Sequence, residues 1–245
     1  MGWKVHPWKV VEEGWEPAHM RLGESLTAIG NGYMGMRGNF EEDYSGDSLQ
    51  GTYLGGVWFP DKTRVGWWKN GYPEYFGKVI NAPRLIGLHV TLDGTPLDLS
   101  TLTVWEFTRE VDMRTGVWHR RVMADTARGS LMLESWRLVS LPRKEVMAMR
   151  YQITPSFDAA VEITPDLDGD VRNTDANYDE AFWELLDGQA GDEEGSILVR
   201  TRANPFGVPR FTVGAAMACR AQGVEWVDGA SRKGYCAARF AGQAQ

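Results

Sequence analysis

Short segments in which apolar and polar residues alternate follow one another along most of the chain, and this pattern predicts β-strands. Segments 85–92 and 95–99 are joined by Asp93-Gly94, a pair that readily adopts the positive φ angles of a tight hairpin turn. Segments 103–111 and 117–124 form a second hairpin pattern. Further strands are expected over 130–140, 145–154, 159–164, 196–203, 210–219 and 234–240.

The strand expected over 130–140 has one inward and one outward face. Alternate positions place one group of side chains on the same side of it, namely Leu131, Leu133, Ser135, Arg137 and Val139. Strands that recur about every 8 to 12 residues, with turn residues between them, are typical of an all-β sandwich or barrel. Because the pattern contains no internal repeat and no linker, we expect residues 1–245 to form a single domain.

One segment, 175–186, departs from the strand pattern and predicts a short helix. Asp175 is suited to be its N-cap. Its apolar residues lie at helical spacing: Tyr178, Phe182, Leu185 and Leu186. The following segment 188–195 is rich in Gly, Asp and Glu, which predicts an exposed loop.

Composition excludes several classes of protein. The formal net charge is -7 with no cluster of basic residues, which removes the electrostatic attraction that dominates nucleic-acid binding. No apolar run reaches the length of a membrane span, so we expect a cytoplasmic protein without membrane contact. Cys219 and Cys236 are the only cysteines, which favours reduced thiols and leaves a disulfide between them as the alternative.

The segment 28–42 concentrates glycines between two apolar stretches and predicts a shaped loop. Gly30, Gly32 and Gly35 fit the dinucleotide-binding pattern, but no helical pattern follows them to receive a pyrophosphate. A turn and bulge between two strands is one interpretation. The other is a binding surface for a polyhydroxylated ligand or a partner, built from the hydrogen-bonding side chains Asn31, Tyr33, Arg37 and Asn39.

Other combinations of residues give little indication of a metal-binding or catalytic site. Residues 166–170 look like a calcium loop but lack the glycine and the bidentate glutamate that such a loop needs, so we expect no metal and favour Asx-turns there. His89 and His119 lie in predicted strands, and acid/base work by either is the alternative to a structural role. No serine or cysteine has the pattern of a nucleophile. Acidic residues are abundant, but abundance identifies no catalytic pair: they include Glu12, Glu13, Glu24, Glu41, Glu42, Asp43, Glu74, Glu106 and Glu134.

The segment 57–77 is unusually aromatic, with irregular spacing and Gly, Pro and Lys between the rings. Such a segment either packs on itself as a long loop or presents an apolar surface to a neighbour. We expect a contact with another domain or subunit, carried mainly by Trp58, Trp67, Trp68 and Tyr72.

The glycine-rich segment also resembles a known family. Its residues Glu24-Ser-Leu-Thr-Ala-Ile-Gly-Asn-Gly-Tyr-Met-Gly-Met-Arg-Gly-Asn-Phe40 closely resemble the N-terminal domain of glycoside hydrolase family 65, which includes the maltose, trehalose, kojibiose and nigerose phosphorylases. Further matches follow in the same order along the chain: Gly51-Thr-Tyr-Leu-Gly-Gly-Val57, Val79-Ile-Asn-Ala-Pro83 and Leu167-Asp-Gly-Asp-Val-Arg-Asn173.

The resemblance implies a large antiparallel β-sandwich of the galactose-mutarotase-like supersandwich type, placed before an (α/α)6 barrel that this chain lacks. In the implied enzyme, a barrel glutamate is the general acid that protonates the leaving oxygen. Inorganic phosphate is the co-substrate, and it attacks the anomeric carbon with inversion. In an implied hydrolase, water takes the place of phosphate. This domain would carry no catalytic residue and no cofactor. It would shape the site for an α-glucosidic disaccharide and stabilise a homodimer. A carbohydrate-binding module and a mutarotase remain the alternatives.

Overall fold

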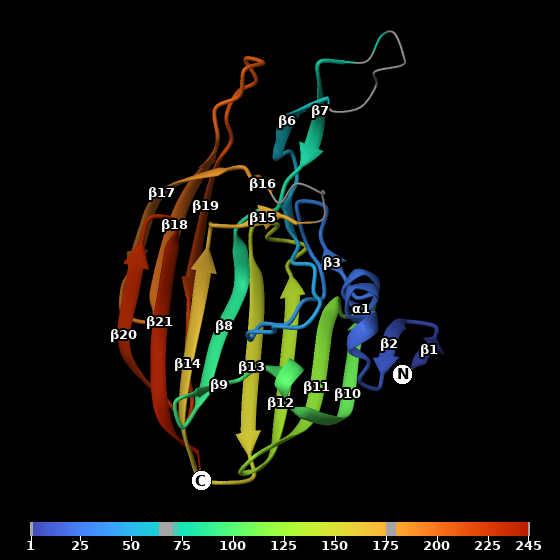
Figure 1. The fold of residues 1–245 in the computed structure, drawn as a ribbon, viewed down its shortest axis with the longest axis vertical. Helices are drawn as coiled ribbons and strands as arrows, with labels where there is room; N and C mark the ends of the chain where they lie inside the picture. The colour runs from blue at the N-terminus through green and yellow to red at the C-terminus, as the bar shows by residue number, and fades with distance from the viewer. Residues whose placement is uncertain (1, 64–70, 72, 175–179, 245) are drawn as a thin grey trace.

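The computed structural model describes residues 2–63, 71, 73–174 and 180–244, and it consists mainly of antiparallel β-sheets (Figure 1). A six-stranded sheet has the order β1 (Gly2–His6), β2 (Lys9–Glu13), β10 (Thr103–Asp112), β11 (Val117–Thr126), β12 (Gly129–Val139) and β13 (Met147–Pro155). A five-stranded sheet has the order β20 (Glu225–Arg232), β21 (Tyr235–Ala244), β14 (Ala159–Asp168), β8 (Arg84–Leu92) and β9 (Thr95–Pro96).

Smaller sheets complete the fold. Strands β17 (Trp183–Ala190), β18 (Glu194–Thr201) and β19 (Thr212–Ala218) form a three-stranded sheet, and β3 (Ile29–Gly30), β4 (Met34–Met36) and β5 (Thr52–Leu54) form another. Two pairs remain, β6 (Trp58–Lys62) with β7 (Tyr75–Val79) and β15 (Arg172–Asn173) with β16 (Glu180–Ala181). The helical elements are short: η1 (Pro17–His19), α1 (Met20–Leu26) and η2 (Leu99–Thr101).

The main core lies between the six-stranded and the five-stranded sheet. Leu88 and Val90 of β8 and Val161 of β14 pack with Val122 of β11 and Leu133 of β12, all of them almost fully buried. The alternation of buried and exposed residues is most regular in β12, where the five residues predicted to share a face are all buried. The predicted all-β sandwich is therefore confirmed, and both predicted hairpins form, with φ of 50° at Asp93 and 75° at Gly94 in the first turn. The second strand of the first hairpin is shorter than the expected segment 95–99, because it covers only Thr95–Pro96 and Leu99 begins η2.

The three-stranded sheet β17–β19 packs closely on the five-stranded sheet, beside β20 and β21 in Figure 1. Glycine makes the close approach possible. A Cβ at Gly188 would lie 1.9 Å from the carbonyl oxygen of Arg232, and one at Gly195 would lie 2.7 Å from Sγ of Cys236. Leu167, Ile197 and Cys236 fill the space next to these contacts.

The helix expected over 175–186 is wrong for the part that the structure describes. Residues 180–181 belong to β16 and residues 183–190 to β17, which pairs with β18; positions 175–179 lie outside the described residues. Phe182 and Trp183 are both buried next to Val199, so pairing and packing override the helical spacing. The loop expected over 188–195 is also wrong at its ends, because β17 and β18 extend into it and leave only residues 191–193 as the turn.

A helix that the sequence pattern did not indicate precedes the glycine-rich segment. α1 covers only seven residues, too few to show a clear period, and it buries Met20, Gly23 and Glu24. Among the described residues, no helix is long and apolar enough to cross a membrane.

Candidate functional site

The glycine-rich segment forms a small three-stranded sheet at one end of the sandwich. β3 and β4 pair through Ile29 with Met36 and Gly30 with Gly35, and β4 then pairs with β5. The turn between β3 and β4 needs glycine at Gly32, where φ is 86°. The interpretation as a turn between two strands is therefore confirmed as the local structure, and no helix follows it to receive a dinucleotide.

The two asparagines of this segment hold it to the rest of the domain. Asn31 accepts hydrogen bonds at Oδ1 from the backbone N–H groups of Tyr33 and Met34, and its Nδ2 donates to the carbonyl oxygen of Ser140 at 2.6 Å. Asn39 is buried, and its Nδ2 donates to the carbonyl oxygen of Leu49 at 2.9 Å. Both side chains thus fix the path of the backbone, and direct contact with a ligand stays a prediction for them.

Arg37 is also engaged within the domain. Its Nε donates to the carbonyl oxygen of Leu49 at 2.8 Å, and Nη2 donates to that of Arg21 at 2.9 Å. The carboxylate of Glu24 lies 3.6 Å from Nη2. Three contacts from one guanidinium join the glycine-rich segment to α1 and to the chain before β5.

Tyr33 differs from these residues because it lines a hollow in the surface. The hollow has a volume of about 490 Å³ and is mainly apolar, with walls from the glycine-rich segment, from β5 and from Val57 and Trp58. Val79 at its edge is 62% exposed. The structure thus brings Tyr33 of the predicted binding segment together with Trp58 of the predicted aromatic surface.

The described part of the aromatic segment packs partly on its own domain. Trp58 stacks on Tyr75 with ring centroids 6.4 Å apart, and Tyr75 contacts Phe206 from the connection between β18 and β19. Phe76 on β7 stays 46% exposed. Strands β6 and β7 project from the end of the sandwich in Figure 1. Trp67, Trp68 and Tyr72 lie outside the described residues, so their part in an interface stays a prediction.

A buried ionic cluster holds the C-terminal end of the glycine-rich segment. Arg120 donates from both Nη atoms to the carboxylate of Glu42, at 2.5 and 2.6 Å, and from Nη2 to Glu41 at 2.9 Å. Ser135 donates to Glu41 at 2.6 Å, and Nε of Arg137 lies 3.1 Å from the same carboxylate. All of these side chains are almost completely excluded from water.

Two of the buried arginines also bind the backbone of this segment. Arg109 pairs with Glu12 and donates from Nη1 to the carbonyl oxygen of Gly38 at 2.9 Å. Arg137 donates from Nη2 to the carbonyl oxygen of Asn39 at 2.8 Å. Strands β10, β11 and β12 each contribute one arginine, and together these arginines fix the position of residues 38–42.

The electrostatics of the cluster follow from burial and pairing. Burial lowers the pKa of Arg137 to about 10, against the opposing effect of Glu41, so the guanidinium stays charged at neutral pH. Burial acts in the same direction on Arg120, but the charges of Glu42 and Glu41 outweigh it and raise the pKa of this arginine. The strand pattern contained a signal for the cluster: Arg109, Arg120 and Arg137 lie in phase with buried apolar positions.

His89 is held between two carboxylates. Its Nδ1 lies 2.7 Å from Asp43 and its Nε2 lies 3.3 Å from Asp166, which also accepts two hydrogen bonds from Arg84. The hydrogen bond to Asp166 and that to Asp43 raise the pKa of His89 to about 9 against the effect of burial. Because both ring nitrogens are engaged and the ring is protonated at neutral pH, His89 is poorly suited to the acid/base work of a mutarotase. His119 stacks on Trp136 and lies 3.4 Å from Glu134.

Replacing His89 with glutamine is expected to reduce the pH dependence of stability. The folded-state pKa of about 9 exceeds the ordinary value of about 6.5, so the interaction stabilises fully below pH 6.5 and is lost as pH rises through 9. Urea unfolding at several pH values should show that the free energy of unfolding falls more steeply between about pH 6.5 and 9 in the wild-type chain than in His89→Gln. Asp43→Asn should give an intermediate slope, and identical slopes in all three chains would contradict the assignment.

Polar groups of the segment 166–173 make hydrogen bonds within the domain. Asp168 accepts a hydrogen bond from the backbone N–H of Asp170, as expected for an Asx-turn, and Asn173 accepts one from the N–H of Asn81. Within the described ranges, no group of three or more His, Cys, Asp or Glu residues is arranged to hold a metal ion. Cys219 and Cys236 are free thiols, so the disulfide alternative is wrong.

A known protein family matches nearly the whole chain. A model of the family described as glycosyl hydrolase family 65, N-terminal domain, matches residues 10–244. This chain belongs to that family. The resemblance expected from the glycine-rich segment is thereby confirmed.

Relatives of this domain are much longer proteins. Maltose phosphorylase from Bacillus subtilis (strain 168) is 48% identical over 221 residues, which are 90% of this chain and 29% of that protein. Alpha,alpha-trehalose phosphorylase from Thermoanaerobacter brockii is 30% identical over 167 residues, covering 64% of this chain and 21% of that protein. A solved structure described as a candidate kojibiose phosphorylase from the human microbiome has the same fold, with a TM-score of 0.87 and 19% identity over 99% of this chain and 31% of that chain.

Proposed function

We propose that this domain is part of a longer enzyme that cleaves an α-glucosidic disaccharide by phosphorolysis. Maltose is the first substrate to test. The similarity to maltose phosphorylase over 90% of the chain carries the proposal. That relative is more than three times as long as the matched region, since the match covers 29% of it. The remaining part of such an enzyme would supply the catalytic domain.

In the proposed reaction, a phosphate oxygen forms a bond to the anomeric carbon while the glycosidic C–O bond breaks. The leaving oxygen takes a proton from a general acid, and inversion at an α-linked glucose yields β-glucose 1-phosphate and free glucose. We assign the general acid to the other domain. The buried carboxylates of the described residues are each paired with an arginine: Glu12 with Arg109, Glu24 with Arg37, Glu41 and Glu42 with Arg120, and Asp166 with Arg84.

The role proposed for this domain is to shape one wall of the substrate site and to contribute to a homodimer. The apolar hollow next to Tyr33 and Trp58 is the surface that we assign to contact with the catalytic domain. The exposed apolar side chains of Val79, which lines the hollow, and of Phe76 on the same strand β7 favour coverage by another part of the enzyme. Asn31, Arg37 and Asn39 would act by holding the backbone that forms this wall.

Replacing Tyr33 with alanine in the full-length enzyme is expected to lower kcat/KM for maltose phosphorolysis by about tenfold, because Tyr33 lines the hollow that we assign to the wall of the site. The assay measures release of β-glucose 1-phosphate from maltose and phosphate. Trp226→Ala is a matched control, since Trp226 is a partly exposed aromatic residue on β20, and it should leave the rate unchanged.

The 245-residue chain alone should release no β-glucose 1-phosphate in the same assay. Turnover by this chain that is lost on mutation of one of its own residues would contradict the proposed division of labour. Unchanged kinetics of Tyr33→Ala with a lowered melting temperature would instead assign this residue to stability alone.

A further inference from the structure

The outer face of the six-stranded sheet carries a β-bulge at the start of β10. Val104 pairs with Ala124 and Glu106 with Met123, so the backbone of Trp105 is skipped in the pairing of β10 with β11. Val104 and Phe107 both pack into the main core. Two consecutive side chains, those of Trp105 and Glu106, therefore point away from the core. A bulge is a common device for redirecting a side chain at a functional position.

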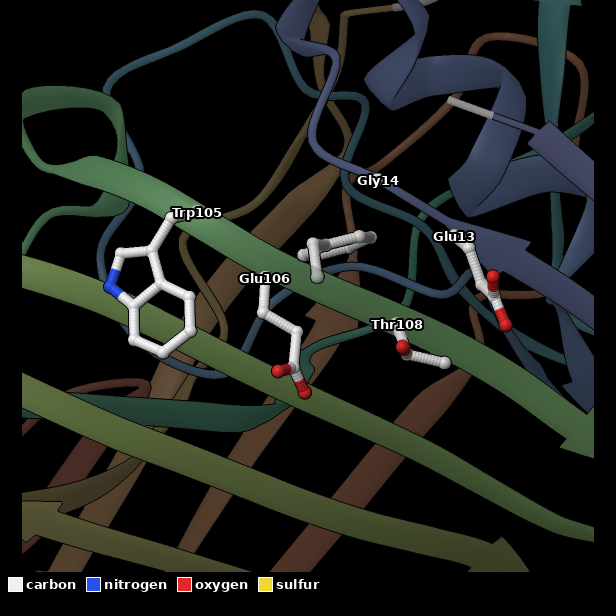
Figure 2. A pocket seen from close by; sticks show the side chains of 6 residues that line it. Glu13, Gly14, Trp105, Glu106 and Thr108 are labelled. Carbon is white, nitrogen blue, oxygen red and sulfur yellow. The ribbon is translucent and has the colours of Figure 1, made fainter.

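Strand β2 leaves β10 at the same place and opens a hollow. Their pairing ends at Thr108 with Glu13, and the chain then turns at Gly14, where φ is 87°. Beyond this point no strand among the described residues pairs with Trp105 or Glu106 on the β2 side of the sheet, and a hollow of about 360 Å³ remains. Figure 2 shows the side chains of Trp105, Glu106, Thr108 and Glu13 around it.

The indole ring of Trp105 is both exposed and fixed in orientation. It is 54% exposed, yet its Nε1 donates to Oδ1 of Asp125 at 3.2 Å. Asp125 is held in turn by a hydrogen bond of 2.6 Å from Ser130. A ring anchored at one edge presents its face to solvent with little loss of conformational entropy on binding, which is the property of a stacking platform.

The rim of the hollow suits hydroxyl groups. Glu106 lies 2.7 Å from Nη1 of Arg121, and both side chains are about 40% exposed, so the carboxylate has free acceptor capacity and the guanidinium has free donors. Glu13 and the hydroxyl of Thr108 add further acceptors on the other side. Each rim carboxylate is paired with a cation, Glu106 with Arg121 and Glu13 with Lys4. The hollow therefore has no excess positive charge to attract an anionic ligand, and the net charge of -7 acts against one as well.

We propose that Trp105 and Glu106 form a binding platform for one pyranose unit of a neutral oligosaccharide. The C–H groups of the sugar stack on the electron-rich face of Trp105, and its hydroxyl groups donate to Glu106 and Glu13 and accept from Arg121. Glu106 and Arg121 point to the face opposite the one on which Arg109 and Arg120 hold the glycine-rich segment. The platform is therefore separate from the hollow at Tyr33. The choice of α-linked glucosides as first probes rests on the proposed function.

The test is calorimetric titration of the 245-residue chain with maltotetraose and, separately, with cellotetraose. Saturable binding of at least one sugar is expected at millimolar concentration, and Trp105→Ala should weaken it by about tenfold or more. Glu106→Gln should weaken it less, because the amide keeps one acceptor oxygen. Trp8→Ala is the matched control, since Trp8 is 48% exposed near the other end of β10 and lies under Arg114.

Three results would overturn the platform. The first is the absence of saturable binding of either sugar, and the second is binding that Trp105→Ala leaves unchanged. The third is sedimentation showing that Trp105 mediates self-association, which would assign this face to a second copy of the chain. Binding of cellotetraose alone would support the platform and count against α-glucosides as its ligand. Because maltose phosphorolysis by the full-length enzyme is a separate measurement, failure of the proposed function is distinguishable from failure of the platform.

Discussion

Replacing Arg120 with methionine is expected to lower the free energy of unfolding by about 3 to 5 kcal/mol, because it leaves buried carboxylates without their main cation. Glu42 loses both of its hydrogen bonds from Arg120, and Glu41 loses one. The measurement is urea unfolding of the 245-residue chain, followed by tryptophan fluorescence.

Arg121→Met is the matched control for this experiment. Arg121 follows Arg120 on β11 but lies on the outer face, where it pairs with Glu106 and is 42% exposed. Exposed ion pairs contribute about 0 to 1 kcal/mol, so this change should be mild. In the double variant Arg120→Met/Glu42→Gln, part of the lost stability should return because one unpaired charge is gone. Equal effects of Arg120→Met and Arg121→Met would show that the buried cluster does not stabilise the fold as described.

Replacing Gly188 with alanine is expected to cost about 3 kcal/mol, because the new methyl group has no space between the two sheets. Its Cβ would lie 1.9 Å from the carbonyl oxygen of Arg232 and 2.4 Å from that of Tyr235. Both are backbone atoms at the paired ends of β20 and β21, so the clash cannot be relieved by a side-chain rotation. The melting temperature and the urea midpoint should both fall.

Gly214→Ala provides the comparison within the same three-stranded sheet. At this position in β19 the side-chain atom nearest to the added methyl group, Cδ1 of Leu198, would lie at an ordinary contact distance of 3.7 Å. The substitution should therefore change stability by about 0.5 kcal/mol or less. A Gly188→Ala chain as stable as Gly214→Ala would mean that the two sheets are not held as closely as the structure indicates.

The buried cluster and the glycine-rich segment belong to one structural unit. Arg109 and Arg137 bind the carbonyl oxygens of Gly38 and Asn39, directly after the strand that forms the wall of the apolar hollow. Residues far from the hollow can thus influence its shape through the backbone. This arrangement explains why a domain that carries no unpaired buried carboxylate among its described residues can still matter for the proposed phosphorolysis.

Local sequence pattern was sufficient for many of the longer strands and for the family, but it did not indicate β1, β2 or β20. Alternation predicted β10, β11 and β12 to within a few residues, and the Asp93-Gly94 pair located a hairpin, because side-chain direction in a strand and turn geometry depend on neighbouring residues alone. The sequence pattern gave a wrong prediction at residues 180–186. Their apolar residues have helical spacing, but residues 183–190 form a strand that pairs with β18. The pattern also missed α1, which is shorter than two periods of an amphipathic helix.

The candidate site was only partly predictable. The sequence singled out Asn31, Tyr33, Arg37 and Asn39 as a group, but their different roles depend on what surrounds each of them in space. The same holds for the acidic residues. Glu41 and Glu42 are buried against arginines, whereas the neighbouring Asp43 pairs with the half-exposed His89.

The sequence by itself determined the all-β class, the positions of many of the main strands along the chain and the membership of this family, since these follow from local periodicity and from contiguous motifs. Only the tertiary structure decided which charges are buried, which glycines permit the close contact of two sheets, and that Trp105 and Glu106 share the outer face. Each of these depends on atoms brought together from distant parts of the chain. Charge burial and steric clearance are set by those spatial neighbours, and no local pattern encodes them.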